Sequence, residues 1–172
     1  MFSLHVYQER RQRLKELMPE KSLAIVAAAA EVIRNRDAEY PFRQSSDFWY
    51  LTGFTEPDAV LVIGPGQPDR LFVRPKHPEQ EVWTGRRMGP DHVKHRLGID
   101  QGYPLEALDT ELKTLLAEIA WVEYPFGCQK STAIVDQAIK AKGLRSRRSD
   151  LLSHRADLSR LLSQARLIKS RQ

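Results

Sequence analysis

Short apolar runs predict the strands of this chain. Residues 23–28 and 59–63 are almost continuously apolar, which is the pattern of strands buried on both faces of a sheet. Residues 47–52 (DFWYLT) are rich in aromatic side chains that favour strands. Residues 71–73 and 121–124 predict two further short strands, and residues 81–84 offer one more. The sequence therefore predicts a sheet of several short strands.

Helices are predicted where apolar residues recur every three or four positions. The first covers residues 6–18 and ends at Pro19. Asp91 is expected to cap a short helix that Gly98 ends, and Asp109 is expected to cap a longer one with a clear apolar stripe.

Two more helices follow in the last third of the chain. One covers residues 134–139 and ends at Gly143, and the other runs from Asp157 with apolar residues at helical spacing. Strands and helices mixed in this order predict an α/β domain in which helices flank a mixed β-sheet.

The composition is that of an ordinary globular domain, with 41% hydrophobic and 28% charged residues among 172. The longest apolar stretch, residues 23–30, is too short to span a membrane. The N-terminus leads into a charged segment without an apolar signal core, and the single cysteine, Cys128, has no internal partner for a disulfide. We therefore expect a cytoplasmic protein with no membrane partner.

The net charge of +5 is unevenly spread. Residues 140–172 hold ten Lys or Arg and two Asp, a net charge of +8, whereas residues 1–139 hold 17 basic and 20 acidic side chains, a net charge of −3. Such asymmetry is typical of a nucleic-acid arm, a surface for an acidic partner, or a solvated tail. The basic segment has helical periodicity and no interleaved aromatic residues, which argues against nucleic acid as the partner.

Residues 34–54 (RNRDAEYPFRQSSDFWYLTGF) hold six of the fourteen aromatic residues of the chain, interleaved with arginines and carboxylates. Aromatic rings bury large areas, and arginine offers a planar fork to carboxylates. This mixture can build an interface, a ligand pocket, a stacking platform for single-stranded nucleic acid, or a rigid internal network. We favour the internal network, because aromatic residues on strands usually belong to a core.

The sequence contains no recognisable catalytic apparatus. Asp91, His92 and His95 place two imidazoles at positions i and i+3, but a zinc site needs three or four converging ligands. Cys128 is the only thiol, no serine lies in a G-x-S-x-G turn, and no glycine-rich phosphate loop occurs. We interpret the two histidines as part of an exposed helix, and we assign no catalytic residue and no metal ligand.

Three segments of the chain carry a resemblance to one family. Trp83, Gly85, Arg86 and Arg87 match a Trp-x-Gly-Arg-Arg segment, and residues 166–170 (RLIKS) match a segment that introduces a catalytic domain. An ordered, longer match includes Arg36, Asp37, Tyr40, Phe42, Arg43, Gln44, Ser46, Phe48, Tyr50, Leu51, Thr52, Gly53, Phe54, Glu56 and Pro57. Together these segments resemble the N-terminal domain of aminopeptidase P, in the creatinase/prolidase superfamily.

The resemblance implies an α/β N-terminal domain followed by a pita-bread domain with two metal ions, usually manganese. There two Asp, one His and two Glu bind the metals, which activate a water for attack on the peptide bond preceding proline. No counterpart of that domain is recognised in this sequence, so the chain alone is expected to be inactive. Residues 1–156 are expected to form the N-terminal domain, and residues 157–172 a helix and linker leading to the absent domain.

The family's N-terminal domain also helps subunits associate and walls the entrance to the active site. By this resemblance Trp83 is the candidate to reach a substrate cleft, with Arg86 and Arg87 beside it, although Trp83 could equally pack on its own sheet. The expected partners are the catalytic domain and the other subunits of a homo-oligomer, with peptide substrate met only indirectly. Two further hypotheses are a stand-alone binding module that uses residues 34–54 or the basic tail, and the N-terminal domain of a prolidase-like or creatinase-like enzyme.

Overall fold

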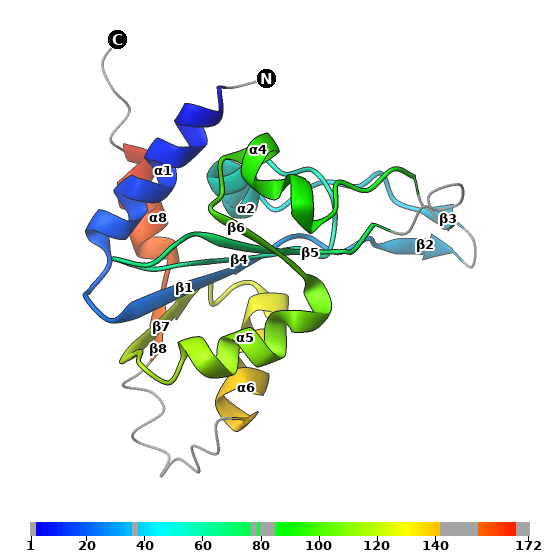
Figure 1. Cartoon of the computed structure of the whole chain (residues 1–172). Coiled ribbons are helices and arrows are strands. Elements are labelled where there is room, and N and C mark those ends of the chain that lie inside the picture. The colour runs from blue at the N-terminus through cyan, green and yellow to red at the C-terminus, as the bar shows by residue number, and fades with distance from the viewer. Residues whose placement is uncertain (1–2, 36–37, 77–78, 80–84, 142–154, 168–172) are drawn as a thin grey trace.

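The computed structural model describes residues 3–35, 38–76, 79, 85–141 and 155–167 (Figure 1). In these ranges the elements follow one another as α1 (Leu4–Leu17), β1 (Ser22–Ala27), β2 (Ile33–Asn35), β3 (Ala38–Glu39), α2 (Ser46–Thr52), β4 (Val60–Ile63), β5 (Arg70–Val73), η1 (Pro90–His92), α4 (Val93–Leu97), β6 (Gln101–Pro104), η2 (Leu105–Ala107), α5 (Leu108–Leu115), β7 (Trp121–Tyr124), α6 (Gln129–Ala141), β8 (Arg155–Asp157) and α8 (Ser159–Leu167). The predicted strand at residues 81–84 and the predicted helix end at Gly143 lie outside the described residues.

One sheet contains six of these strands, in the order β6-β5-β4-β1-β7-β8. β1 pairs antiparallel with β4, where Ala24 lies opposite Ile63, and parallel with β7, where Ala24 lies opposite Glu123. β4 and β5 are antiparallel, whereas β5 and β6, and β7 and β8, are parallel. The predicted mixed sheet is therefore confirmed. β2 and β3 pair separately as a two-stranded arm that projects from the body (Figure 1).

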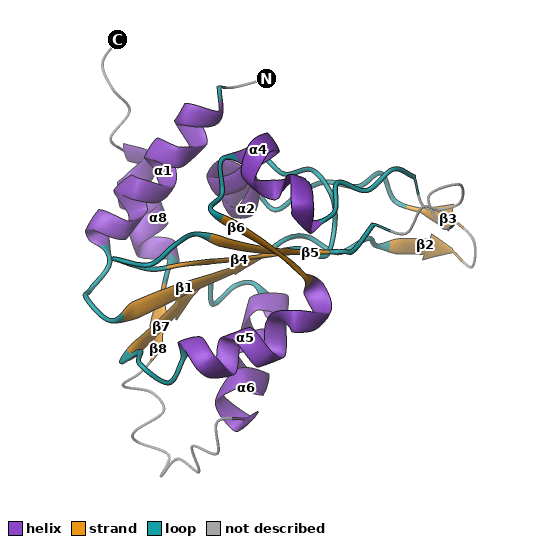
Figure 2. Cartoon of the chain, viewed as in Figure 1, coloured by secondary structure: helices purple, strands orange, loops and turns teal. Residues whose placement is uncertain are grey.

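Helices cover both faces of the sheet, as Figure 2 shows. α1, α2, α4 and α8 enclose one core, which contains Leu14, and α5 and α6 enclose a second, which contains Leu112. Successive residues of β1 belong to alternate cores, Leu23 to the second and Ala24 to the first, which explains why this strand is apolar at every position. In the described ranges, no helix has the length and apolar character needed to cross a membrane.

Two helices begin differently from the sequence prediction. α4 follows the 3-10 turn η1, so Asp91 lies inside that turn and His92 takes the N-cap position. α5 follows the turn η2, with Ala107 at the N-cap. Asp109 instead lies in the first turn of α5, where its carboxylate accepts a hydrogen bond of 2.8 Å from the Gln137 amide. The two acidic residues still lie near helix N-termini, where negative charge is stabilised.

Residues 47–52 were predicted as a strand, and this prediction was wrong because they form most of helix α2. The helix ends at Gly53, whose φ of 66° is left-handed and whose N–H donates to the Trp49 carbonyl at 2.8 Å. The buried positions have helical spacing, at Phe48, Leu51 and Thr52. Packing of this face against the core outweighs the strand preference of the aromatic residues.

The predicted helix from Asp157 is observed as α8. The Asp157 carboxylate accepts hydrogen bonds from the backbone N–H groups of Ser159 (3.0 Å) and Phe126 (3.3 Å). Burial opposes ionisation, but these hydrogen bonds outweigh it and lower the pKa of Asp157. Leu158 and Leu162 are buried in the first core, and α8 lies beside α1 (Figure 1). The boundary between residues 156 and 157 stays a prediction.

Candidate functional site

Gln44 joins the loops on either side of α2. Its Oε1 accepts hydrogen bonds from the backbone N–H groups of Ala29 (2.8 Å) and Ser45 (2.9 Å). Its Nε2 donates to the carbonyl oxygens of Phe54 (3.3 Å) and Glu56 (2.9 Å). All four contacts are to backbone atoms, so a single half-buried side chain fixes the loop before α2, the loop after it and the start of the segment that follows β1.

The ring of Tyr50 contacts two guanidinium groups. The centre of its ring is 4.3 Å from the guanidinium carbon of Arg10 and 4.9 Å from that of Arg166. Arg166 also donates to Asp47 Oδ1 at 2.6 Å, and the Tyr50 hydroxyl lies 3.4 Å from the Ala165 carbonyl oxygen. Through this stack, side chains of α1, α2 and α8 meet at one point.

A groove of about 670 Å³ opens beside the stack, and we call it the aromatic groove. The loop before α2, the exposed side of α2 and the C-terminal end of α8 form its walls. Trp49 is 38% exposed there, and Arg43 is exposed as well. The lining residues are Phe42, Arg43, Gln44, Ser46, Trp49, Tyr50, Thr55 and Arg166. The groove thus gathers five residues of the family motif, together with Arg166 from far along the chain.

Other residues of the motif lie elsewhere. Tyr40 is 54% exposed next to the two-stranded arm, and its ring centre lies 5.7 Å from the guanidinium carbon of Arg34. Arg36, Asp37 and Trp83 lie outside the described residues. A place for Trp83 at a substrate cleft therefore stays a prediction.

The two arginines predicted beside Trp83 have different environments. Arg86 is exposed, whereas the side chain of Arg87 is only 12% exposed and lies 3.9 Å from the Glu31 carboxylate. The next backbone N–H, that of Met88, donates to the Glu56 carboxylate at 2.8 Å. Two carboxylates therefore hold this segment against the body of the domain and leave Arg86 at the surface.

Asp58 is the centre of an ion-pair network that sequence reasoning missed. Its carboxylate pairs with Arg74 and Lys130, and Arg74 lies 3.5 Å from Glu31. Burial raises the pKa of Asp58, but the hydrogen bonds and charges of Lys130 and Arg74 outweigh it and lower that pKa. The backbone of Asp58 has a left-handed φ of 54°. The turn signal Pro57-Asp58 was the only sequence hint, because the partners lie 16 and 72 residues away.

Asp91, His92 and His95 are exposed on η1 and α4. Within the described ranges, no three His, Cys, Asp or Glu side chains form a group that could hold a metal ion. The described residues therefore offer no ligand set for a manganese ion. Cys128 is a free, half-buried thiol just before α6.

Comparison with known sequences gives a family match and several relatives. The family model "Aminopeptidase P, N-terminal domain" matches residues 7–121. The chain is 44% identical to the Xaa-Pro aminopeptidase of Escherichia coli over 114 residues, which are 64% of this chain and 26% of that protein. It is 38% identical to the Xaa-Pro aminopeptidase of Haemophilus influenzae over 116 residues, 66% of this chain and 27% of that protein. The chain spans about a quarter of the length of these curated relatives.

Solved structures extend the likeness to nearly the whole chain. A single-residue variant of E. coli aminopeptidase P matches with a TM-score of 0.87 and 36% identity, covering 99% of this chain and 40% of that one. Proline aminopeptidase P II from Yersinia pestis matches with a TM-score of 0.84 and 34% identity, covering 99% of this chain and 40% of that one. The family match over most of the sequence and the shared fold agree, and the chain belongs to the aminopeptidase P N-terminal domain family.

Proposed function

We propose that this chain serves as the non-catalytic N-terminal domain of a Xaa-Pro aminopeptidase, a metallopeptidase that removes an N-terminal residue preceding proline. The observation that carries the proposal is the coverage: the fold of E. coli aminopeptidase P matches 99% of this chain, yet the match uses 40% of that enzyme's chain. The remaining part of such an enzyme supplies the chemistry in this proposal. Two manganese ions are then held by a separate catalytic domain.

The proposed contributions of this domain are to associate subunits and to wall the entrance of an active site. The exposed Arg86 supports the second role, because Arg87 and Met88 hold its segment in place. Trp83, three residues earlier, is proposed to reach a cleft from the same segment. The large exposed areas of Val32 (59%) and Tyr40 (54%) near the two-stranded arm support the first role, because exposed apolar groups mark interfaces.

A chimera tests this proposal, with this chain replacing the matching part of the E. coli enzyme. We expect the chimera to hydrolyse a Xaa-Pro peptide with manganese and to elute as an oligomer from a sizing column. In this background Arg86→Ala should raise KM more than it lowers kcat, whereas Arg96→Ala, an exposed change on α4, should alter neither. A chimera that unfolds cooperatively but shows no turnover would contradict the proposal.

The other proposed properties follow from the same assignment. We propose the cytoplasm as the compartment, on the ground that Cys128 is a free thiol. Prolidase-like or creatinase-like parentage has less support, because the relatives from E. coli, H. influenzae and Dictyostelium discoideum all carry the name Xaa-Pro aminopeptidase.

A further inference from the structure

The aromatic groove has the composition of a docking site for a peptide. Trp, Tyr and Arg are the residue types that contribute most to binding at protein interfaces, and Trp49, Tyr50, Arg43 and Arg166 all line this groove. Its volume of about 670 Å³ is within the range of ligand pockets, so it holds a few side chains of a partner. Trp49 is 38% exposed, although such a large ring is usually mostly buried.

The walls of the groove are already fixed without an occupant. Gln44 makes four hydrogen bonds to the loops on both sides of α2. Arg166 is held by the Asp47 carboxylate and by the ring of Tyr50, which Arg10 also contacts. A preformed site loses little conformational freedom on binding, so a short segment can gain affinity from few contacts.

The charge of the groove indicates the chemistry of its occupant. Arg166 is paired with Asp47, whereas Arg43 has no ion pair within the ranges that the structure describes. The exposed guanidinium of Arg43 can therefore bind a carboxylate through two parallel hydrogen bonds. The rings beside it offer the kind of surface on which proline-rich segments dock, because an extended proline helix is ordered before it binds.

We propose that the aromatic groove binds an extended, acidic, proline-containing segment of a partner protein, with a carboxylate on Arg43 and a proline ring against Trp49. Aromatic–arginine surfaces also stack the bases of single-stranded nucleic acid. Such binding needs a track of cations along the phosphates, but this groove offers one arginine without an ion pair in the described ranges, and the Asp47 carboxylate also lies at it. The proposal goes beyond the role in a Xaa-Pro aminopeptidase and does not depend on it.

Fluorescence anisotropy with the full chain tests the proposal directly. The probe is a fluorescein-labelled peptide of alternating glutamate and proline, and the competitors are the matching lysine–proline peptide and a single-stranded oligothymidine. We expect saturable binding of the glutamate peptide, and binding of the other two that is weaker by at least about tenfold at the same salt concentration. No saturation below about 1 mM, or equal binding of the lysine peptide, would overturn the proposal.

Variants of the chain locate the binding site. Arg43→Glu should weaken binding of the glutamate peptide by at least about tenfold, and the exposed position of Arg43 should leave folding intact. Trp49→Ala should weaken it by a similar factor. The matched charge reversal Arg96→Glu, exposed on α4, should leave binding unchanged. Binding that survives Arg43→Glu, or a preference for oligothymidine that this change abolishes, would refute the peptide assignment.

Discussion

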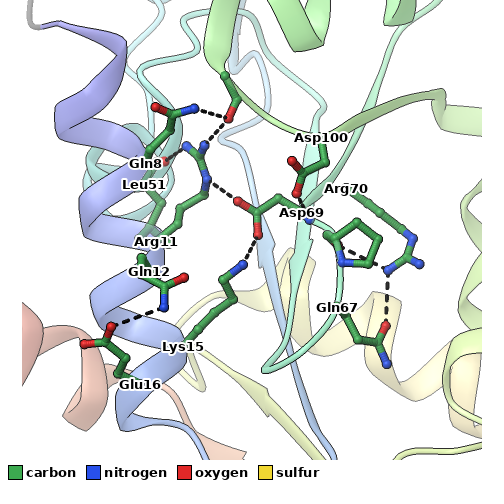
Figure 3. A network of polar contacts seen from close by, with 12 residues as sticks. Gln8, Arg11, Gln12, Lys15, Glu16, Leu51, Gln67, Asp69, Arg70 and Asp100 are labelled. Atoms are coloured by element: carbon green, nitrogen blue, oxygen red, sulfur yellow. Dashed lines mark hydrogen bonds and ion pairs between the residues drawn. The ribbon is translucent and has the colours of Figure 1, made fainter.

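Arg11 supports the sharpest stability prediction, because its side chain is only 1% exposed and joins three separate segments to α1 (Figure 3). Its Nε donates to Asp69 Oδ2 at 2.7 Å, its Nη1 to the Leu51 carbonyl at 2.8 Å and its Nη2 to the Gly98 carbonyl at 2.6 Å. The two carbonyls lie at the C-terminal ends of α2 and α4, where helices leave acceptors without intrahelical partners. Arg11→Met keeps the apolar stem but removes all three hydrogen bonds.

The remaining contacts set the size of the expected effect. Removing one member of a buried ion pair costs about 3–5 kcal/mol. Asp69 keeps a second cation, Lys15 Nζ at 2.9 Å, and the Gly98 carbonyl keeps the amide of Gln8 at 3.3 Å. We therefore expect Arg11→Met to lower the free energy of unfolding by about 3 kcal/mol. Asp69→Asn should lower the free energy of unfolding by more, because it removes the anion that pairs with the buried charge of Arg11.

Urea denaturation of the two variants, followed by circular dichroism, measures both effects. The midpoint should fall in the order wild type, Arg11→Met, Asp69→Asn, with little change in the slope of the transition. Arg96→Met removes the same charge from an exposed position on α4 and should stay within about 0.5 kcal/mol of wild type. The reasoning is refuted if Arg11→Met matches this control, or if Asp69→Asn is the milder of the two network variants.

Three further predictions concern stability. Glu123 is 2% exposed, its Oε2 has no hydrogen-bond partner in the described part of the chain, and burial raises its pKa above the ordinary 4.5. Glu123→Gln should therefore raise the urea midpoint at pH 8, and this gain should shrink as the pH falls toward 4.5. Gly53→Ala should lower the free energy of unfolding by about 1–3 kcal/mol more than Gly66→Ala does. Both glycines have a left-handed φ, but only at Gly53 would the new Cβ lie 2.6 Å from the Tyr7 ring, and equal shifts of the melting temperature would contradict this reasoning. Asp58→Asn should lower the free energy of unfolding by about 1 kcal/mol at pH 7. Because the pKa of Asp58 is lowered, this loss of stability should disappear as the pH falls below 3.8, and a loss that persists in acid would argue against the ion pairs.

The interior of the sheet could be predicted from sequence because its strands are buried on both faces. β1 and β4 read as continuous apolar runs, and β7 has the predicted bounds of residues 121–124. The edge strands could not be predicted in this way. β6 (QGYP) and β8 (RAD) are short and largely polar. Each forms a strand because it pairs with a neighbouring strand, β6 with β5 at Phe72 and β8 with β7 at Glu123.

The sequence predicted which segment of the chain contains the candidate site, but not how its side chains are arranged. Aromatic residues and arginines between residues 34 and 54 indicated an interface, a pocket or an internal network, yet the strand assigned to residues 47–52 is a helix. The groove also requires Arg166, which lies 119 residues from its partner Asp47. No local pattern encodes such a distant pair, because it depends on α8 packing beside α1 in the folded chain.

Incubation of the purified, folded chain alone with a Xaa-Pro peptide and manganese tests the central claim most directly. A full-length Xaa-Pro aminopeptidase from E. coli serves as the positive control in the same buffer. The proposed non-catalytic role predicts no release of the first residue above the rate without protein, although the chain unfolds cooperatively in urea. Steady turnover that scales with chain concentration and stops on addition of a chelator would contradict it.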